Sequence, residues 1–415
     1  MARLAKMILL VGTIAAVVAA CGAGEERDAP LLGADVDRAP VGSADPVRLA
    51  QGLNSFGLEY HRLLAARSPG ENVVFSPLSI GIAFGMADAG ARGATAAQIE
   101  QVFRLPASGA ELHAAFDALD RELANAGKSR LRLANRMYPA VGYPLVPDFV
   151  ETLGRSYGAP LERLDFAADP GGARERINRW VAERTEKRIP ELLPAGFVDP
   201  TTVLVLVNAL YLEAKWSQPF GKYPTESAPF TRLDGSSVDV PTMRNAELRT
   251  RYVDAEGYQA VELPYGDGEL SMLVLVPKHG RFGALERRLD ARGLAAVDAA
   301  MGEGIVDLFL PRWSASFSVD LVDTLPELGL TLPFRGGDFT GISPGNPFIG
   351  AGVHAADIEV DEHGTVAAAA TGLGFAESGP PEPDAVIRAD RPFLYLIRHT
   401  ETGAVLFLGR VVDPN

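Results

Sequence analysis

The segment VDEHGTVAAAATGLGFAESGPPEP, residues 360–383, differs in composition from the rest of the chain. It opens with a charged turn that contains Gly364, continues through small residues without proline, lysine or arginine, and ends at a proline cluster. Small uncharged side chains can be buried at little cost, and every non-proline residue can donate to a strand ladder. The segment is therefore predicted to be a strand that can enter an existing sheet, with a flexible Ala/Gly loop as the alternative.

The segment also has a period of two, which is the period of a β-strand. One face would carry alternate residues beginning at Thr365 and ending at Phe375, small at first and then apolar. The other face would carry the intervening residues from Val366 to Ala376. Neither face carries a charge, so both could be covered by protein.

The sequence around this segment indicates strands. GVHAADIEV (352–360) leads into it, and TTVLVLVNALYLEAKW (201–216) is nearly continuous in apolar residues, as in a strand covered on both faces. YQAVELPYGDGELSMLVLVPK (258–278) and PFLYLIRHTETGAVLFLGRVV (392–412) each read as two strands joined by a turn that contains glycine.

Helical patterns dominate the earlier part of the chain. Apolar residues recur at steps of four and three from Leu49 to Leu63. Ser76 can cap a helix that begins at Pro77, and Thr95 with Gln98 has the spacing of a capping box. Helices early and strands late predict an α+β fold with large, mostly antiparallel sheets.

The composition is that of a folded soluble protein, with 47% hydrophobic and 22% charged residues in a chain of 415. The net charge of −14 argues against a nucleic-acid-binding surface. Length alone suggests two or three domains, but no linker rich in Pro, Gly or Ser divides the chain after about residue 46. One large domain is the other possibility.

The first residues, MARLAKMILLVGTIAAVVAACGAG, have two basic residues and then an apolar stretch too short to span a membrane. Residues 1–20 are predicted to be a signal peptide. Val18-Ala19-Ala20-Cys21 resembles the cleavage box of bacterial lipoproteins, which predicts a lipid on Cys21 and attachment to a membrane. A plain secretory signal is the alternative. Residues 21–45 would then be a lipidated cysteine and a disordered tether, and 46–415 the folded domain.

Enzymatic chemistry finds little support in the sequence. GISPG (341–345) matches the G-x-S-x-G pattern of a hydrolase, but the residue after Ser343 is Pro344, which lacks the N–H that the oxyanion hole requires. The six histidines show no metal-ligand spacing, and no phosphate-binding glycine loop follows a strand. The sequence predicts a protein without metal or cofactor that is not an enzyme.

Two polar residues interrupt otherwise apolar strands, Asn208 and His354. A lone polar residue in a core strand is usually part of a hydrogen-bonded structure. Together with Ser76 and Ser79 at a helix start, they would also suit a polar latch between strands that must sometimes separate.

The chain resembles the serpin family, over about residues 46–415. The resemblance rests on NVVFSPLSI (72–80), LVNALYLEAKW (206–216), the strand holding His354, DEHGTVAAAAT (361–371) and RPFLYLIRHTETGAVLFLGRVVDP (391–414), in that order. It implies a single domain of three β-sheets with about eight or nine helices and an exposed reactive-centre loop at about 362–385. With the lipoprotein-type signal peptide, the chain resembles a bacterial serpin.

The resemblance also implies roles for single residues. Ser76, Ser79, Asn208 and His354 match the shutter, a polar cluster that lets the central sheet open, and Trp216 and Glu362 match the breach, where the loop first enters. The residues that match the hinge are Glu362, Gly364, Thr365, Val366, Ala367, Ala368, Ala369 and Ala370. Val366 and His363 depart from the residues that are common there.

The implied function is suicide inhibition of a serine or cysteine protease by a monomer. The protease would cut the loop and form an acyl-enzyme, and the freed strand would insert into the sheet. Two alignments place the cut at Glu377-Ser378, which we favour, or at Ser378-Gly379. Because no Lys or Arg lies nearby, a trypsin-like target is not expected. The alternative is a non-inhibitory serpin that serves as a binding or structural protein. The protein would be exported, and either anchored to the bacterial envelope by lipid or secreted.

Overall fold

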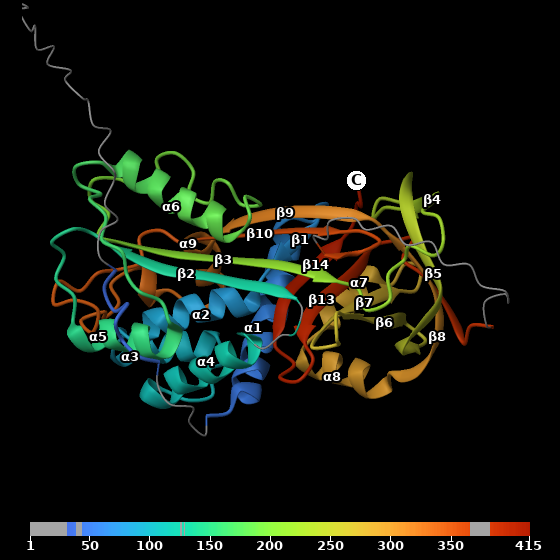
Figure 1. Ribbon diagram of the computed structural model, residues 1–415, viewed down its shortest axis with the longest axis horizontal. Helices are drawn as coiled ribbons and strands as arrows, with labels where there is room; N and C mark the ends of the chain where they lie inside the picture. The colour runs from blue at the N-terminus through green and yellow to red at the C-terminus, as the bar shows by residue number, and fades with distance from the viewer. Residues whose placement is uncertain (1–30, 39–43, 125–126, 128, 366–381) are drawn as a thin grey trace, which may run out of the picture. The chain divides into compact units, whose positions relative to one another are not determined.

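The computed structural model describes residues 31–38, 44–124, 127, 129–365 and 382–415 (Figure 1). The α-helices are α1 (Pro46–Arg67), α2 (Pro77–Asp88), α3 (Gly93–Val102), α4 (Gly109–Ala124), α5 (Pro147–Thr152), α6 (Pro170–Arg184), α7 (Phe282–Arg288), α8 (Ala291–Ala300) and α9 (Leu321–Thr324). The strands are β1 (Val73–Phe75), β2 (Arg130–Pro139), β3 (Leu204–Lys215), β4 (Glu226–Thr231), β5 (Ser237–Asp254), β6 (Tyr258–Tyr265), β7 (Leu270–Pro277), β8 (Gly302–Pro311), β9 (Trp313–Asp320), β10 (Val353–Val360), β11 (Gly364–Thr365), β12 (Ala385–Arg388), β13 (Phe393–His399) and β14 (Val405–Val411).

Hydrogen bonding arranges the described strands in two sheets. One has nine strands in the order β1-β14-β13-β7-β6-β5-β8-β12, with β4 paired to β5, and the other has five in the order β2-β3-β11-β10-β9. The nine-stranded sheet combines two of the three expected sheets, because β5 continues from one to the other. A register irregularity between Asn245 and Leu248 divides β5, whose first half pairs with β4 and whose end pairs with β6. The expected α+β fold is confirmed.

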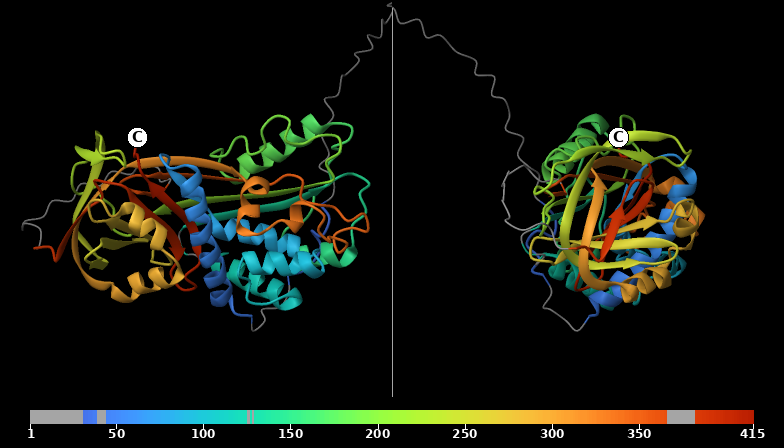
Figure 2. Two further views of the ribbon diagram at one scale, coloured as in Figure 1. Left: turned by 180° about the vertical axis from the view of Figure 1, so that it is seen from behind. Right: turned by 90° about the vertical axis from the view of Figure 1, so that its right-hand side faces the viewer.

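The five-stranded sheet is covered on both faces, as the apolar run of β3 predicted. Val205 and Val207 pack in a cluster with residues of α6, whereas Leu206 and Leu210 belong to the main core. Figures 1 and 2 show α6 on one face of this sheet and α1, α2 and α4 on the other. The sheet therefore lies between two layers of helices.

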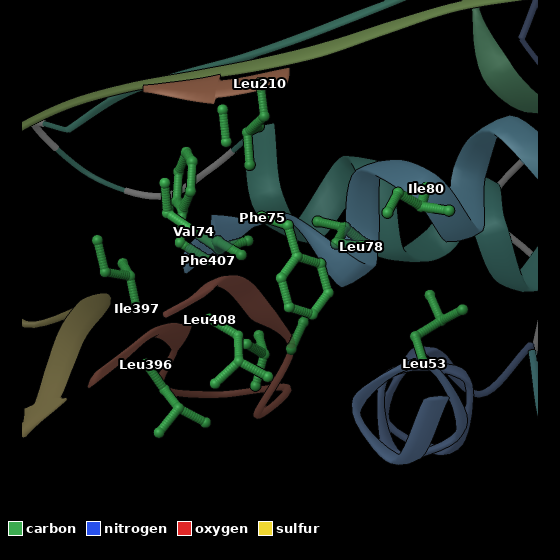
Figure 3. Packing of buried hydrophobic residues seen from close by; sticks show 14 of the residues in the cluster. Leu53, Val74, Phe75, Leu78, Ile80, Leu210, Leu396, Ile397, Phe407 and Leu408 are labelled. Carbon is green, nitrogen blue, oxygen red and sulfur yellow. The ribbon is translucent and has the colours of Figure 1, made fainter. Parts of the chain in front are cut away.

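The main core forms where α1, α2, β1, β13 and β14 meet. Figure 3 shows Phe75 of β1 among side chains of these elements, with Leu53 of α1, Leu78 of α2 and Leu408 of β14 nearby. All four of these side chains are at most 1% exposed. Since Cys21 is the single cysteine of the chain, no internal disulfide can form, and the stability of the fold must come from this packing.

The predicted helix starts are confirmed in one case and wrong in another. Ser76 caps α2, with its hydroxyl accepting a hydrogen bond from Ser79 N at 3.0 Å. Thr95 and Gln98 do not form a capping box, because α3 begins at Gly93. Both side chains instead bind a later loop, since Thr95 Oγ1 accepts from the N–H of Asp338 and Gln98 Oε1 accepts from backbone N–H groups at 331 and 332.

Residues 31–38, within the predicted disordered tether, lie against the folded body. Leu32 and Leu161 exchange two backbone hydrogen bonds of 2.8 and 2.9 Å. The Arg38 guanidinium binds Asp117 of α4 at 2.8 Å through Nε and Asp120 at 2.9 Å through Nη2. The prediction missed this docking because a composition rich in Ala, Gly, Asp and Pro does not show which distant carboxylate is in reach. Among the described residues, no helix is long and apolar enough to cross a membrane.

Candidate functional site

β3 and β10 pair directly over a short stretch only, and we call the line where they meet the seam. The two strands are parallel, and they pair directly only at His354 with Asn208 and at Ala355 with Ala209. By contrast, β2 pairs with β3 over the whole length of β2, and β9 with β10 over all of β10. Toward Ala214 and Val360, the two strands lie far enough apart for another strand to pair with both.

β11 occupies the open end of this seam. Gly364 pairs with Lys215 and Thr365 with Ala214 of β3, while Thr365 also pairs with Val360 of β10. Thr365 is 1% exposed, and its hydroxyl shares a 2.6 Å hydrogen bond with the hydroxyl of Tyr265. Gly364 and Thr365, near the start of the segment 360–383, are thus already a strand between β3 and β10.

Gly364 is required by the close approach of β11 to β3. Its φ is +154°, and a Cβ atom at this position would lie 2.0 Å from the carbonyl oxygen of Ala214. Since that oxygen is backbone, a larger residue would push β11 out of the seam.

Trp216 holds the turn that leads into β11. Its backbone N–H donates to the carbonyl of His363 at 2.8 Å, and its indole Nε1 donates to the carbonyl of Asp361 at 2.9 Å. The ring stacks on Tyr265 with centroids 4.4 Å apart, and Tyr265 in turn binds Thr365. Trp216 and Thr365 are therefore linked through a single buried tyrosine.

Glu362 is fixed at the same end of the seam. Its carboxylate accepts hydrogen bonds from Arg312 at 2.8 Å (Nε) and 2.5 Å (Nη2), and also from the hydroxyl of Thr225. Burial alone would raise the pKa of Glu362, but the hydrogen bonds from Arg312 and Thr225 lower it below its usual range. The side chain is therefore ionised at neutral pH and ties the start of the segment to β8–β9 and β4.

At the closed part of the seam, the four residues predicted as a latch come together. The hydroxyl of Ser79 donates to Asn208 Oδ1 at 2.5 Å, and His354 Nδ1 lies 3.3 Å from the same oxygen. The N–H of Ser76 donates to His354 Nε2 at 3.0 Å. All four residues are at most 2% exposed. α2, β3 and β10 are thus joined by polar contacts where the two strands pair directly.

His354 is a neutral imidazole with a defined tautomer. Because Nε2 accepts from the Ser76 N–H, the ring proton is on Nδ1, which faces Asn208. Complete burial lowers the pKa of His354 to about 3. The ring therefore stays uncharged at any pH where the protein would normally work.

The sequence of the chain matches a known protein family over almost the whole folded body. Residues 51–414 match the family described as Serpin (serine protease inhibitor). The chain is a serpin.

Several relatives and solved structures are similar to this serpin over most of their length. It is 36% identical to leukocyte elastase inhibitor A of Rattus norvegicus, over 88% of this chain and 100% of the relative. It is 31% identical to an uncharacterized serpin-like protein of Methanosarcina mazei, over 90% and 89%. The uncleaved ovalbumin structure has a TM-score of 0.79 at 29% identity, covering 88% and 100%, and native tengpin, a thermophilic serpin, has 0.82 at 24%, covering 93% and 100%. A family of protease inhibitors is consistent with a chain that is not an enzyme.

The structure also identifies seam residues that the sequence reasoning missed. Asn135 of β2 is the register partner of Asn208, whose amide donates to Asn135 Oδ1 at 2.5 Å. Arg312 and Thr225 bind Glu362, and Tyr265 links Trp216 to Thr365. Asn135 could have been found as a polar residue in the middle of a strand, but no local signal marks the others.

Of the remaining predicted residues, most lie outside the part of the chain that the structure describes. Val366, Ala367, Ala368, Ala369, Ala370, Glu377, Ser378, Gly379 and Cys21 lie outside the described residues. Ser343 is fully buried in a turn, where its hydroxyl accepts from the N–H of Gly345 at 3.2 Å. That turn is followed by loop rather than by the helix of a hydrolase elbow, which agrees with the argument from Pro344.

Proposed function

We propose that this serpin inhibits proteases as a suicide substrate, by inserting its cut loop between β3 and β10. One observation carries the proposal. β11 already lies between these strands at one end of the seam, and the strands pair directly at only two positions beyond it. Insertion would extend β11, and the only direct pairings between β3 and β10 that it would break are those at two positions.

The pairings of β11 predict the register of the inserted strand. Continued residue by residue along β3 from Thr365–Ala214 and along β10 from Thr365–Val360, both registers place Thr371 between Asn208 and His354. These are the two residues that now pair with each other. Insertion would therefore separate Asn208 from His354 and place the hydroxyl of Thr371 between them, while Ser76 and Ser79 stay in place at the start of α2.

The same register gives the length of the inserted strand, from which the free energy of insertion and the displacement of the protease can be estimated. Residues 366–375 would lie along β3 from Glu213 to Leu204, which adds about ten strand residues. At ~1 kcal/mol net for each new ladder hydrogen bond, insertion would release roughly 10 kcal/mol. At ~3.3 Å per residue, it would carry an attached protease about 33 Å along the sheet. The acyl-enzyme that attaches the protease is made by the protease itself.

The target we propose is an elastase-like serine protease. The support is the 36% identity to leukocyte elastase inhibitor A and the absence of Lys and Arg from residues 360–383. The cut is placed at Glu377-Ser378, or at Ser378-Gly379, on the sequence argument alone. A papain-like cysteine protease is the second class to test.

We also propose that the protein acts outside the cytoplasm as a monomer. The signal peptide at residues 1–20 and the cysteine at 21 support export and attachment to the cell envelope by lipid. The test is metabolic labelling with a radioactive fatty acid. Label that persists in Cys21→Ser would contradict lipidation of this residue.

The proposed inhibition is tested by incubating the chain with elastase-, chymotrypsin-, subtilisin- and papain-like proteases. The expected product is a complex that survives boiling in SDS and has the mass of the protease plus the chain without its C-terminal fragment. Peptide mapping of that fragment identifies the cut. Cleavage by all four enzymes without a complex would instead favour a non-inhibitory serpin that serves as a binding or structural protein.

A further inference from the structure

A hollow of about 340 Å³ is lined by residues of α7, α8 and the turn at Gly257 that precedes β6. Apolar side chains form most of its wall, among them Leu285, Leu289 and Val297, with the ring of Tyr258 at one side. Two arginines, Arg281 and Arg288, complete it. This volume is within the range of sites for small organic ligands.

The walls of the hollow are fixed to the rest of the molecule. The carboxylate of Asp298 on α8 accepts two hydrogen bonds from Arg398 of β13, at 2.7 and 2.9 Å. Glu286 on α7 binds Arg410 of β14 at 3.1 and 3.2 Å. The turn is held as well, because the N–H of Lys278 donates to the carbonyl of Gly257 at 3.0 Å. The site is therefore formed before any ligand arrives, which reduces the entropic cost of binding.

Two arginines bring positive charge to the hollow, whose one neighbouring carboxylate at the start of α8, Asp290, caps that helix through the N–H of Gly293. The acidic side chains of the two helices, Glu286 and Asp298, are neutralised by buried arginines of the nine-stranded sheet. Arg281 and Arg288 form no ion pair with any acidic side chain in the described part of the chain. The hollow therefore combines two arginines with apolar side chains, in a protein of net charge −14.

From this combination we infer that the hollow binds a small amphipathic carboxylate, one with an apolar chain or ring system. The guanidinium groups would bind the carboxylate through paired N–H donors, and the apolar part would cover Leu285, Leu289 and Val297. A neutral compound of the same shape would leave both arginines without a partner. The inference does not rest on the proposed protease inhibition, since no residue of the β3–β10 seam lines the hollow.

The test uses the full chain carrying Cys21→Ser, so that no attached lipid competes, and laurate below its micelle concentration as the probe. Isothermal titration calorimetry should show one site per chain. Laurate amide, which lacks the charge, should bind at least about tenfold more weakly, as should laurate to Arg288→Ala or Arg281→Ala. Ala296→Trp, which places a large ring in the hollow from the exposed side of α8, should abolish binding.

The matched control is Arg292→Ala, an exposed arginine of α8 outside the hollow, which should bind laurate as the parent does. No heat of binding at ~1 mM laurate would overturn the inference, because a site of this size should bind a ligand of 14 heavy atoms at or below that concentration. Equal binding of laurate and its amide, or undiminished binding to Ala296→Trp, would also overturn it.

Discussion

At the scale of the residue, His354 and Glu362 lie at opposite ends of the seam and differ in charge, since His354 is neutral and Glu362 is ionised. His354 is kept neutral by burial and by the Ser76 N–H that its Nε2 accepts. Glu362 is kept charged by Arg312, at the more open end. Both side chains hold β10 and the residues after it in position, but only the buried imidazole resists gaining charge.

The burial of His354 predicts that acid weakens the intact protein. In the unfolded chain a histidine takes up a proton below about pH 6.5, whereas His354 in the fold stays neutral down to a pKa of about 3. Stability is therefore full above about pH 6.5 and falls as the pH decreases, by about 3 kcal/mol at pH 4.5 for this one group. His113, whose pKa burial lowers to about 4, acts in the same direction.

The measurement is the urea midpoint of the intact chain at pH 6.5 and at pH 4.5. His354→Gln, which cannot titrate but can still accept from Ser76 and donate to Asn208, should lose distinctly less stability between these pH values than the parent. His279→Gln changes an exposed histidine and is the control. An equal loss in His354→Gln and the parent would show that His354 does not carry the effect.

At the scale of the element, β11 makes the seam asymmetric. It separates β3 and β10 at one end, and the strands meet only at Asn208 and Ala209. In the register of β11, Ala369 would enter between Leu210 and Ala356, both buried in the main core. Thr365 is already buried, so a charge there would disturb the intact sheet, and Ala369 is the better position to test insertion.

Ala369→Arg should convert the serpin from an inhibitor into a substrate, because insertion would bury an unpaired charge at a cost of several kcal/mol. Gel electrophoresis should show cut chain and free protease where the parent gives a covalent complex. Glu382→Arg introduces the same residue at an exposed position after the cut and should leave the complex intact. A full yield of complex from Ala369→Arg would contradict insertion in this register.

Residues 31–38 are a second segment whose contacts join positions far apart in the sequence, since Arg38 binds Asp117 of α4. Asp117 is 3% exposed, and Arg38 is one of its two arginine partners, with Arg121 bound at 2.8 Å. Arg38→Ala would leave part of a buried carboxylate unpaired and should lower stability by about 1–2 kcal/mol.

This loss can be measured as a lower urea midpoint, together with faster proteolysis between residues 31 and 45. Arg48→Ala, an exposed arginine in the first turn of α1, provides the comparison. If both variants unfolded at the same urea concentration as the parent, the docked segment would contribute nothing to stability.

At the scale of the whole molecule, the proposal is that the intact chain is not in its most stable arrangement. In the described part of the chain, the seam of the five-stranded sheet holds the two residues of β11, and we propose that it can hold a full strand. Filling the seam would add about ten ladder hydrogen bonds at ~1 kcal/mol each without unfolding the rest of the body.

A chain cut in its loop by a protease that escapes trapping should therefore be more heat-resistant than the intact chain. A gain of roughly 10 kcal/mol corresponds to a rise in the melting temperature of at least about 10 °C for a body of this size. Calorimetry of the cut and intact forms measures it. Cut Ala369→Arg should show no such gain. The same melting temperature for both forms of the parent would contradict a strained intact state.

The sequence by itself determined the features that depend on neighbouring residues. The apolar run 201–216 predicted a strand buried on both faces, Ser76 before Pro77 predicted the start of α2, and the composition of 360–383 predicted a segment able to join a sheet. Strand patterns and helix capping are local, and the structure shows them in β3 and α2. Of the segment 360–383, the structure shows Gly364 and Thr365 as a strand, and residues 366–381 lie outside the described residues.

Only the tertiary structure decided how far the seam is open and what holds it. Glu362 meets Arg312 across fifty positions, and Arg38 meets Asp117 across seventy-nine. The hollow is likewise formed by α7, α8 and the turn at Gly257 together, so no single stretch of the sequence predicts it. Such contacts depend on where the packed core brings distant backbones together, and no local pattern of residues carries that information.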